Sequence, residues 1–265
     1  MNMSIESPSS AAIPLASYPS LRGRGVLITG GSSGIGGDMV RAFARQGARV
    51  AFTGRNAASA QQVLDDCSGA TYKPLFLRCD MSDVAQLRDA VAEADAWTLG
   101  LSALLNNVAD DDRHAFLEVT PDYFDSRVAI NLRAHFFAAQ AALPSLQRQG
   151  GGSIINLGST SWKNKVAGYA AYATCKSAMT GLTRSLAREF GPAGVRVNTL
   201  TPGWVMTDKQ LSTWVDAEGE RAMDEHHCLP GRISGSDVAQ LALFLAADDS
   251  RMITAQEFVI DAGWT

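Results

Sequence analysis

The stretch Gly25-Val-Leu-Ile-Thr-Gly-Gly-Ser-Ser-Gly-Ile-Gly36 decides the fold of this chain. Its first five residues are a short apolar run that predicts a buried strand, and helical periodicity resumes directly after the glycines. A second apolar run, Arg49–Thr53, predicts the next strand. A glycine-rich turn between a strand and a helix lets the backbone approach a pyrophosphate, and the helix N-terminus supplies N–H groups. The order strand, glycine turn, helix, strand therefore favours a nucleotide loop over a plain turn.

Length and composition agree with a single α/β domain. The chain has 265 residues, of which 46% are hydrophobic and 19% charged, as is ordinary for a soluble globular enzyme. The net charge of −4 and the lack of a basic run argue against nucleic-acid binding. No apolar run approaches the roughly 18 residues that a membrane span needs, so we expect no membrane association.

The cysteines and histidines do not form metal-binding patterns. The four cysteines are scattered without CxxC spacing, which indicates a reducing compartment. His226 and His227 are adjacent and would point in different directions on a helix, so we expect no metal. Residues 1–20 carry no signal-peptide pattern and predict a flexible tail before a domain at 21–265, and we expect a cytoplasmic protein.

A candidate catalytic group lies between Ser159 and Lys176. Tyr172 and Lys176 are four residues apart, so a helix would place both side chains on one face. A free tyrosine titrates at about pH 10. A nearby ammonium lowers that pKa, which lets the tyrosine exchange protons with a substrate hydroxyl. Ser159 follows an apolar run and is expected to hold the substrate oxygen. Alone, such a pair is usually a surface feature.

The chain resembles the short-chain dehydrogenase/reductase family in the stretch Thr29–Gly36 and in Ser159, Tyr172 and Lys176. The spacings of thirteen and four residues in the Ser-Tyr-Lys set are those of the family. Further matches follow in order over residues 21–265: Asp80, Asn106-Asn107, Asn131, Arg196-Val-Asn198, Pro202-Gly203 and Thr207. The resemblance implies a single-domain Rossmann fold, with a parallel sheet of about seven strands and helices on both faces.

The resemblance also implies the roles of particular residues. Asn131, Ser159, Tyr172 and Lys176 would be catalytic, with Asn131 bending its helix (Val128–Gln140) and holding a water between the lysine and solvent. The alternative for Asn131 is a buried asparagine satisfied by backbone. The implied cofactor contacts are Gly30, Ser32, Ser33, Gly34, Ile35, Gly36, Arg55, Asp80, Met81, Asn107, Val108, Ala109, Tyr172, Lys176, Pro202, Gly203, Val205 and Thr207.

The end of the second strand bears on which nicotinamide cofactor binds. Family members that use NAD carry an acidic residue there, but this chain has Gly54 followed by Arg55. An arginine fork suits a 2′-phosphate, so NADP is favoured and NAD remains possible. Asp80 is the implied adenine-contacting acid; alternatively it caps a helix from Val84 to Ala94, a role that Ser82 could also fill.

One motif departs from the family. The family's Asn-Asn-Ala-Gly appears here as Asn106-Asn107-Val108-Ala109, and the side chains in place of glycine would crowd or shift the cofactor wall. The charged run Asp110–His114 follows at once. It is either a solvated loop or a site where Asp111 accepts hydrogen bonds from a polyhydroxylated substrate.

The charged run is similar to bacterial sugar 1-dehydrogenases of this family, as are Gly203–Lys209 and the terminal Asp261–Trp264. A substrate loop is expected at about 203–231, where Trp204 either stacks on a sugar face or only packs. The implied substrate contacts are Asp111, Ser159, Trp162, Asn164, Tyr172 and Trp204.

These residues predict an NAD(P)-dependent oxidoreductase that oxidises an aldose at C1 to the lactone. One alternative is an NADPH-dependent carbonyl reductase of the same family, acting on a 3-oxoacyl thioester, a ketone or a polyol. Alternatives of other classes are a catalytically silent NADP-binding regulator and a purely structural protein. The resemblance further implies a homo-oligomer, either a dimer or a tetramer.

Overall fold

The computed structural model describes residues 15–265, and most of the predicted tail lies outside this range. Within it, Tyr18 packs against the core and its N–H donates to Gln46 Oε1 at 2.8 Å. Pro19–Leu21 then forms one 3₁₀ turn whose Leu21 is buried. Tyr18 and Leu21 therefore both contribute to the core of the domain expected at residues 21–265.

A single parallel sheet of seven strands forms the centre of the molecule, in the order β3-β2-β1-β4-β5-β6-β7. This order confirms the predicted fold. The chain runs outward from β1 to β3 and then returns to the other side of β1 at β4, so the switch point lies between β1 and β4. The strands are β1 Gly25–Ile28, β2 Arg49–Gly54, β3 Leu75–Arg78, β4 Leu101–Asn106, β5 Gly152–Leu157, β6 Val195–Pro202 and β7 Glu257–Ile260.

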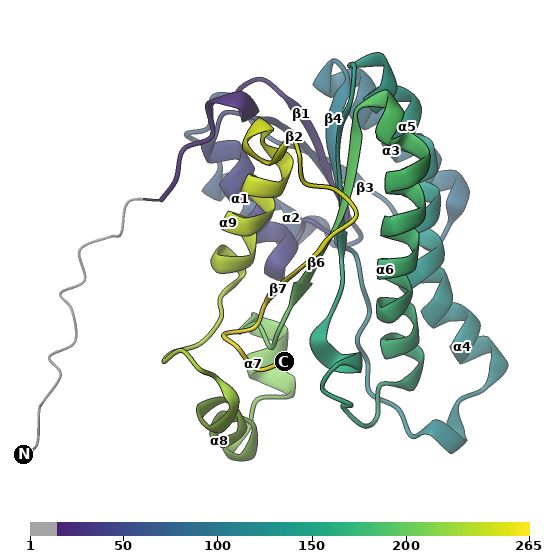
Figure 1. The fold of residues 1–265 in the computed structure, drawn as a ribbon, viewed down its shortest axis with the longest axis vertical. Coiled ribbons are helices and arrows are strands. Elements are labelled where there is room, and N and C mark those ends of the chain that lie inside the picture. Colours follow the sequence, from purple (N-terminus) through teal and green to yellow (C-terminus); the bar gives the residue numbers. More distant parts are fainter. Residues whose placement is uncertain (1–14) are drawn as a thin grey trace, which may run out of the picture.

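Helices cover both faces of the sheet (Figure 1). On one face lie α1 (Gly34–Arg45), α2 (Ala57–Asp66) and α9 (Gly235–Ala246), whose apolar residues share one buried cluster with β1 and β2. On the other face lie α3 (Val84–Thr98), α5 (Ala134–Arg148) and α6 (Ala170–Phe190). Buried strands packed on both sides read as continuous apolar runs, which is why the sequence revealed them.

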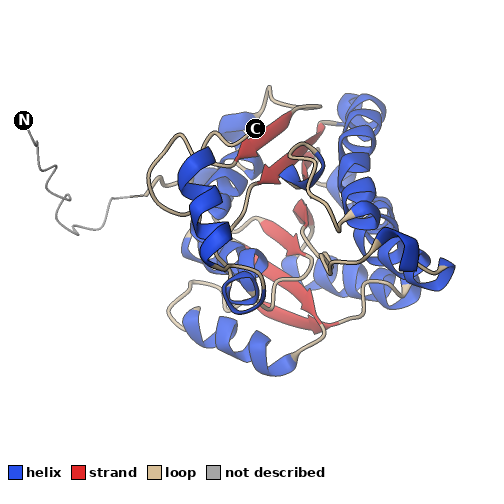
Figure 2. Ribbon diagram, turned by 90° about the horizontal axis from the view of Figure 1, so that it is seen from below, coloured by secondary structure: helices blue, strands red, loops and turns tan. Residues whose placement is uncertain are grey.

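Three short helices extend past the carboxyl ends of the strands: α4 (Pro121–Val128), α7 (Asp208–Thr213) and α8 (Ala217–His226) (Figure 1). The last two come from the segment expected to close over a substrate. Figure 2 looks onto this end of the sheet, where loops and short helices surround the strand ends.

The cap of α3 differs from both residues considered for it. Asp83 is the N-cap, and its Oδ1 accepts from the N–H groups of Ala85 at 2.9 Å and Gln86 at 3.2 Å. Asp80 lies three residues earlier and accepts instead from the N–H and hydroxyl of Ser82. Because a different residue caps the helix, the Asp80 side chain remains at the strand end, where a nucleotide would pass.

The helix expected from Val128 to Gln140 is interrupted. A π-helical segment, Ala129–Arg133, separates α4 from α5 and carries the fully buried Asn131. π-turns inside helices are uncommon and frequently occur at functional sites.

No helix within residues 15–265 is both long and apolar enough to cross a membrane.

Candidate active site

One cavity of about 810 Å³ opens at the carboxyl ends of the strands. Its lining begins at the glycine turn after β1, passes the ends of β2, β4 and β5, and reaches Tyr172 and the α7–α8 segment. A cavity at the switch point of a doubly wound sheet is where such folds bind ligands.

The glycine turn has the shape of a phosphate cradle. Gly30 has a φ of +68°, and a Cβ on Gly36 would lie 2.1 Å from the Gly30 carbonyl oxygen, so a side chain at Gly36 would displace the turn. Asn107 fixes the turn to β4 by donating from Nδ2 to the carbonyls of Thr29 at 2.9 Å and Gly30 at 3.1 Å. Ser33 precedes α1 without a side-chain cap within the described chain, so the first N–H groups of α1 are available to an anion.

The wall formed by Val108 accommodates the departure from the family motif. The Val108 N–H donates to Thr29 Oγ1 at 3.1 Å, and its carbonyl lies 2.7 Å from Nε2 of His135. His135 is fully buried, and burial lowers its pKa to about 3, so the ring is neutral and its Nε2–H donates to Val108. The valine therefore lines the cavity on a backbone held from both sides.

At the end of the cavity beside β2, position 54 is a glycine and so provides no carboxylate. A Cβ on Gly54 would lie 2.6 Å from Ser32 Oγ, so the serine hydroxyl occupies the space that a side chain would need. Arg55 lines the cavity and makes no ion pair within residues 15–265. Asp80 and Met81, at the end of β3, line the same region. Together with the glycine turn, these residues offer backbone N–H groups and a guanidinium to the phosphates of a dinucleotide.

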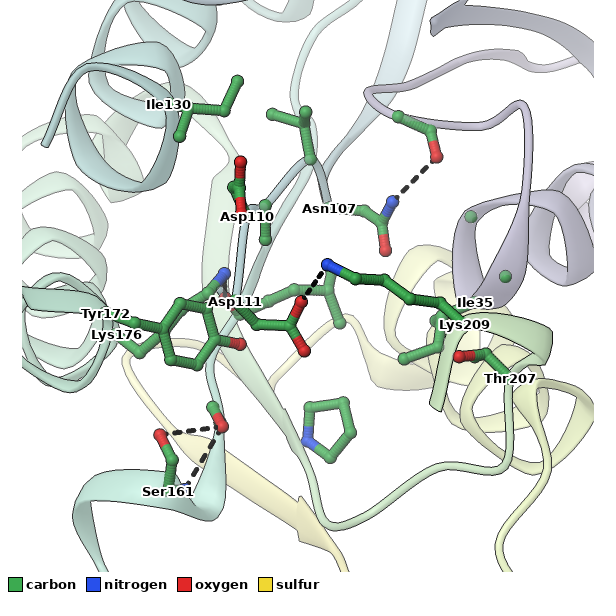
Figure 3. Close-up of a pocket in the computed structure, with 18 of the residues that line it drawn as sticks. Ile35, Asn107, Asp110, Asp111, Ile130, Ser161, Tyr172, Lys176, Thr207 and Lys209 are labelled. Atoms are coloured by element: carbon green, nitrogen blue, oxygen red, sulfur yellow. Dashed lines mark hydrogen bonds and ion pairs between the residues drawn. The ribbon is translucent and has the colours of Figure 1, made fainter. Parts of the chain in front are cut away.

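The predicted catalytic side chains converge at the other end. Ser159 lies just after β5 and its hydroxyl donates to Ser161 Oγ at 3.1 Å, while Tyr172 and Lys176 come from the first two turns of α6 (Figure 3). Lys176 Nζ donates to the carbonyl of Leu157 at 2.8 Å and lies 5.8 Å from the centre of the Tyr172 ring. All three side chains line the cavity.

The pKa of Tyr172 shifts in the opposite direction to the decrease expected from the nearby lysine. Burial raises the pKa of Tyr172, the negative charge of Asp111 raises it further, and a hydrogen bond with Ser159 opposes both effects. Burial also lowers the pKa of Lys176 to about 8. In the chain alone, desolvation of the phenolate therefore outweighs any help from the lysine, and a low tyrosine pKa requires further positive charge in the cavity.

Asn131 lies behind the cavity wall, outside its lining. Its Oδ1 accepts from the Asp110 N–H at 2.9 Å and its Nδ2 donates to the Asp110 carbonyl at 3.0 Å. The side chain thus holds the start of the acidic run in place. Its role in carrying a proton through water stays a prediction.

The acidic run is tied into the structure by cations. Arg127 Nη1 pairs with Asp110 at 2.7 Å, and Lys209 Nζ pairs with Asp111 at 2.6 Å and with Asp112 at 3.3 Å. Asp111 lines the cavity as predicted, so the run is more than a solvated loop. The three carboxylates approach within 4.8 Å of one another, and these cations offset part of their negative charge.

The predicted tryptophans have different positions. Trp204 lines the cavity, and its Nε1–H donates to Gln210 Oε1 at 2.9 Å. Trp162 lies outside the cavity lining, with its side chain 37% exposed and Lys163 Nζ 4.6 Å from its ring centre. Trp162 lies in the 3₁₀ turn Thr160–Trp162, and its substrate contact stays a prediction that this position does not favour.

Every other predicted site residue except Asn131 lines the cavity. Sequence reasoning missed further lining residues of the substrate end: Arg113, Tyr169, Lys209, Gln210 and Trp264. Lys209 and Trp264 lie in stretches already noted for their likeness to sugar dehydrogenases, but no spacing rule singled them out.

A nucleotide cavity that ends on a Ser-Tyr-Lys group, in a doubly wound parallel sheet, defines a nicotinamide-dependent oxidoreductase. A family model described as enoyl-(acyl carrier protein) reductase matches residues 30–265. The chain belongs to the short-chain dehydrogenase/reductase family and is an oxidoreductase that acts on CH–OH groups.

Individual relatives cover nearly the whole chain. It is 42% identical to the probable galactose dehydrogenase of Rhizobium meliloti (strain 1021) over 95% of this chain and 98% of the relative. It is 41% identical to the D-xylose 1-dehydrogenase of Caulobacter vibrioides over 94% of this chain and 98% of the relative.

Solved structures share the fold. A putative short-chain alcohol dehydrogenase from Sinorhizobium meliloti 1021 superposes with a TM-score of 0.88 at 30% identity, covering 92% of this chain and 97% of the other. A blue fluorescent protein from a metagenomic library, in complex with NADPH, superposes with a TM-score of 0.85 at 34% identity, covering 93% and 99%.

Proposed function

We propose that this protein oxidises an aldose at C1 to the corresponding lactone, with NADP as the favoured cofactor. The observation that carries the proposal is the position of Asp111 beside Tyr172 in the cavity, where an acceptor of substrate hydroxyl groups faces the proton acceptor (Figure 3). The likeness to a probable galactose dehydrogenase and a D-xylose 1-dehydrogenase supports a sugar as the substrate.

The protein's own residues would perform the proton chemistry. Ser159 donates a hydrogen bond to the C1 oxygen, and Tyr172 accepts the hydroxyl proton. Lys176, held by the Leu157 carbonyl, stabilises the phenolate from behind. When bound, an oxidised nicotinamide cofactor would supply a hydride acceptor and a positive charge that favours the Tyr172 phenolate. Asn131 and water would then return the proton to solvent.

The preference for NADP rests on the residues at the end of β2. A 2′-phosphate would find Arg55 unpaired within the described chain and no carboxylate at position 54 to repel it. The likeness to a protein solved with NADPH agrees with this preference.

Initial rates of reduced-nicotinamide formation test the proposal, measured with NADP and NAD separately on D-xylose, D-galactose and L-arabinose. We expect turnover on at least one aldose, faster with NADP, and a lactone in the product mixture by NMR. Absence of turnover on every sugar, together with NADPH-dependent reduction of a ketone or a 3-oxoacyl thioester, would replace the sugar assignment with carbonyl reduction.

A further inference from the structure

The short helix α7 contributes two side chains to the catalytic end of the cavity. Lys209 Nζ donates to Asp111 Oδ1 at 2.6 Å, and Gln210 Nε2 donates to Asp111 Oδ2 at 2.7 Å. Asp111 therefore has one partner from α7 on each carboxylate oxygen, although it lies on the loop after β4. The side chains of both Asp111 and Lys209 are partly withdrawn from solvent, at 23% and 50% exposure.

The orientation of the Gln210 amide is fixed by a second contact. Trp204 Nε1–H donates to Gln210 Oε1 at 2.9 Å, so the amide nitrogen must face Asp111. A continuous chain of hydrogen bonds thus runs from Trp204 through Gln210 and Asp111 to Lys209. All four side chains line the cavity, and such a network holds its members in one geometry.

The network lies next to the reacting group. In Figure 3 the Asp111 carboxylate lies between the Tyr172 hydroxyl and the Lys209 amine. Both side chains line the same cavity, and the negative charge of Asp111 adds to the effect of burial in raising the pKa of Tyr172.

We propose that Lys209 and Gln210 determine substrate specificity by holding Asp111 in place. Asp111 and Lys209 together then recognise the hydroxyl on the carbon next to the one that is oxidised. This inference rests on the proposed function, in which the oxidised carbon is C1 and its neighbour is C2. Hydroxyls on adjacent carbons lie within hydrogen-bonding reach of common partners. A C1 hydroxyl at Ser159 and Tyr172 therefore presents the C2 hydroxyl to Asp111.

The donor and acceptor capacities are complementary. A carboxylate oxygen can accept more than one hydrogen bond. Each Asp111 oxygen accepts one from α7, so it can accept another from the C2 hydroxyl. The bonds to Asp111 and Asp112 use all but one of the N–H groups of the Lys209 ammonium. The remaining N–H can donate to the C2 oxygen. A 2-deoxy sugar would leave both charged groups without this partner, and sites built to bind a hydroxyl reject such analogues strongly.

The test compares D-galactose with 2-deoxy-D-galactose in wild-type protein and in variants. For the wild type we expect kcat/KM to be roughly tenfold to a hundredfold higher for D-galactose. Lys209→Met and Gln210→Leu should lower kcat/KM much more for D-galactose than for the 2-deoxy sugar, chiefly through KM. The ratio of kcat/KM for D-galactose to that for the 2-deoxy sugar should therefore fall toward one in both variants. Lys209→Arg should retain most of the wild-type ratio.

Lys73→Met is the matched control, because Lys73 is an exposed lysine remote from the cavity lining; its ratio should equal that of the wild type. Cofactor binding, followed by fluorescence, should be unchanged in every variant. Equal losses for both sugars in Lys209→Met would overturn the inference and leave Lys209 as a structural residue of α7. Absence of turnover on D-xylose, D-galactose and L-arabinose alike in the wild type would instead contradict the proposed function, and with it the basis of the inference.

Discussion

Tyr172 and Lys176 lie one turn apart on α6, but the lysine bonds to the Leu157 carbonyl rather than to the phenol. The sequence spacing predicted this arrangement of the two residues, because one helical turn is fixed by local geometry. It could not predict the direction of the tyrosine pKa, which depends on burial by residues distant in the chain. Burial and Asp111 both raise that pKa, so formation of the phenolate would need additional positive charge beside Tyr172.

His135 should make the protein less stable in mild acid. Its pKa in the folded chain is lowered to about 3 by burial, whereas an unfolded histidine titrates at about 6.5. The unfolded state therefore binds the proton first. As pH falls from about 6.5 toward 3, this residue should cost roughly 1.4 kcal/mol per pH unit in free energy of unfolding.

His135→Gln retains an N–H donor for the Val108 carbonyl but cannot titrate. We expect its melting temperature to fall less than that of the wild type between about pH 7 and 5, whatever its value at neutral pH. Parallel declines in the two proteins, measured by calorimetry, would show that His135 does not set the acid sensitivity.

Arg55 should matter for NADP and not for NAD. Replacing it with glutamine removes a charge-assisted bond to the 2′-phosphate, which should raise KM for NADP roughly tenfold and leave KM for NAD nearly unchanged. Arg45→Gln is the control, because Arg45 is exposed at the end of α1 and outside the cavity lining. Equal effects of Arg55→Gln on both cofactors would refute the assignment.

Among the elements, the strands and the glycine turn could be predicted because their signals are local: buried parallel strands are apolar runs, and the turn needs residues without side chains. The contacts that α7 makes with Asp111 could not be predicted. This helix has only six residues, and Lys209 and Gln210 reach Asp111 across nearly a hundred residues of chain. The position of Trp162 could not be predicted for a similar reason, since it lies in a short 3₁₀ turn after Ser159 and outside the cavity lining.

The glycine turn offers a test at this scale. In Gly36→Ala the new methyl would meet the Gly30 carbonyl oxygen at 2.1 Å and Asn107 Nδ2 at 2.6 Å, so the turn must shift. We expect at least a tenfold loss of cofactor affinity by titration and a destabilisation of about 1–3 kcal/mol. Gly69→Ala, where the methyl would meet nothing within 4 Å, should change neither quantity. Normal cofactor affinity in Gly36→Ala would contradict the assignment of this turn.

At the scale of the whole molecule, large apolar side chains are exposed in α4, in α5 and in the 3₁₀ turn Phe116–Glu118 before α4. Phe116 is 74% exposed, Leu117 95%, Phe124 42% and Phe136 47%. Exposed apolar patches of this kind commonly mark protein–protein contacts. We therefore propose that the protein is a homo-oligomer, as a dimer or a tetramer, with this surface covered.

Sedimentation velocity tests the proposed assembly. The wild type should sediment as two or four chains. Leu117→Asp should shift it toward smaller species, because a buried charge at an interface is costly. Leu99→Asp is the control, since Leu99 is 71% exposed at the end of α3, away from this surface. A monomeric wild type would contradict the proposal.

Tyr172→Phe tests whether Tyr172 removes the proton as an aldose is oxidised. The substitution removes only the hydroxyl, so the fold and the cofactor cavity should persist. The measurement is the rate of reduced-nicotinamide formation on the best aldose, beside cofactor affinity by fluorescence, in the variant and the wild type. We predict a loss of turnover of at least about a thousandfold with cofactor affinity within twofold of the wild type. Substantial residual turnover in Tyr172→Phe would contradict the account.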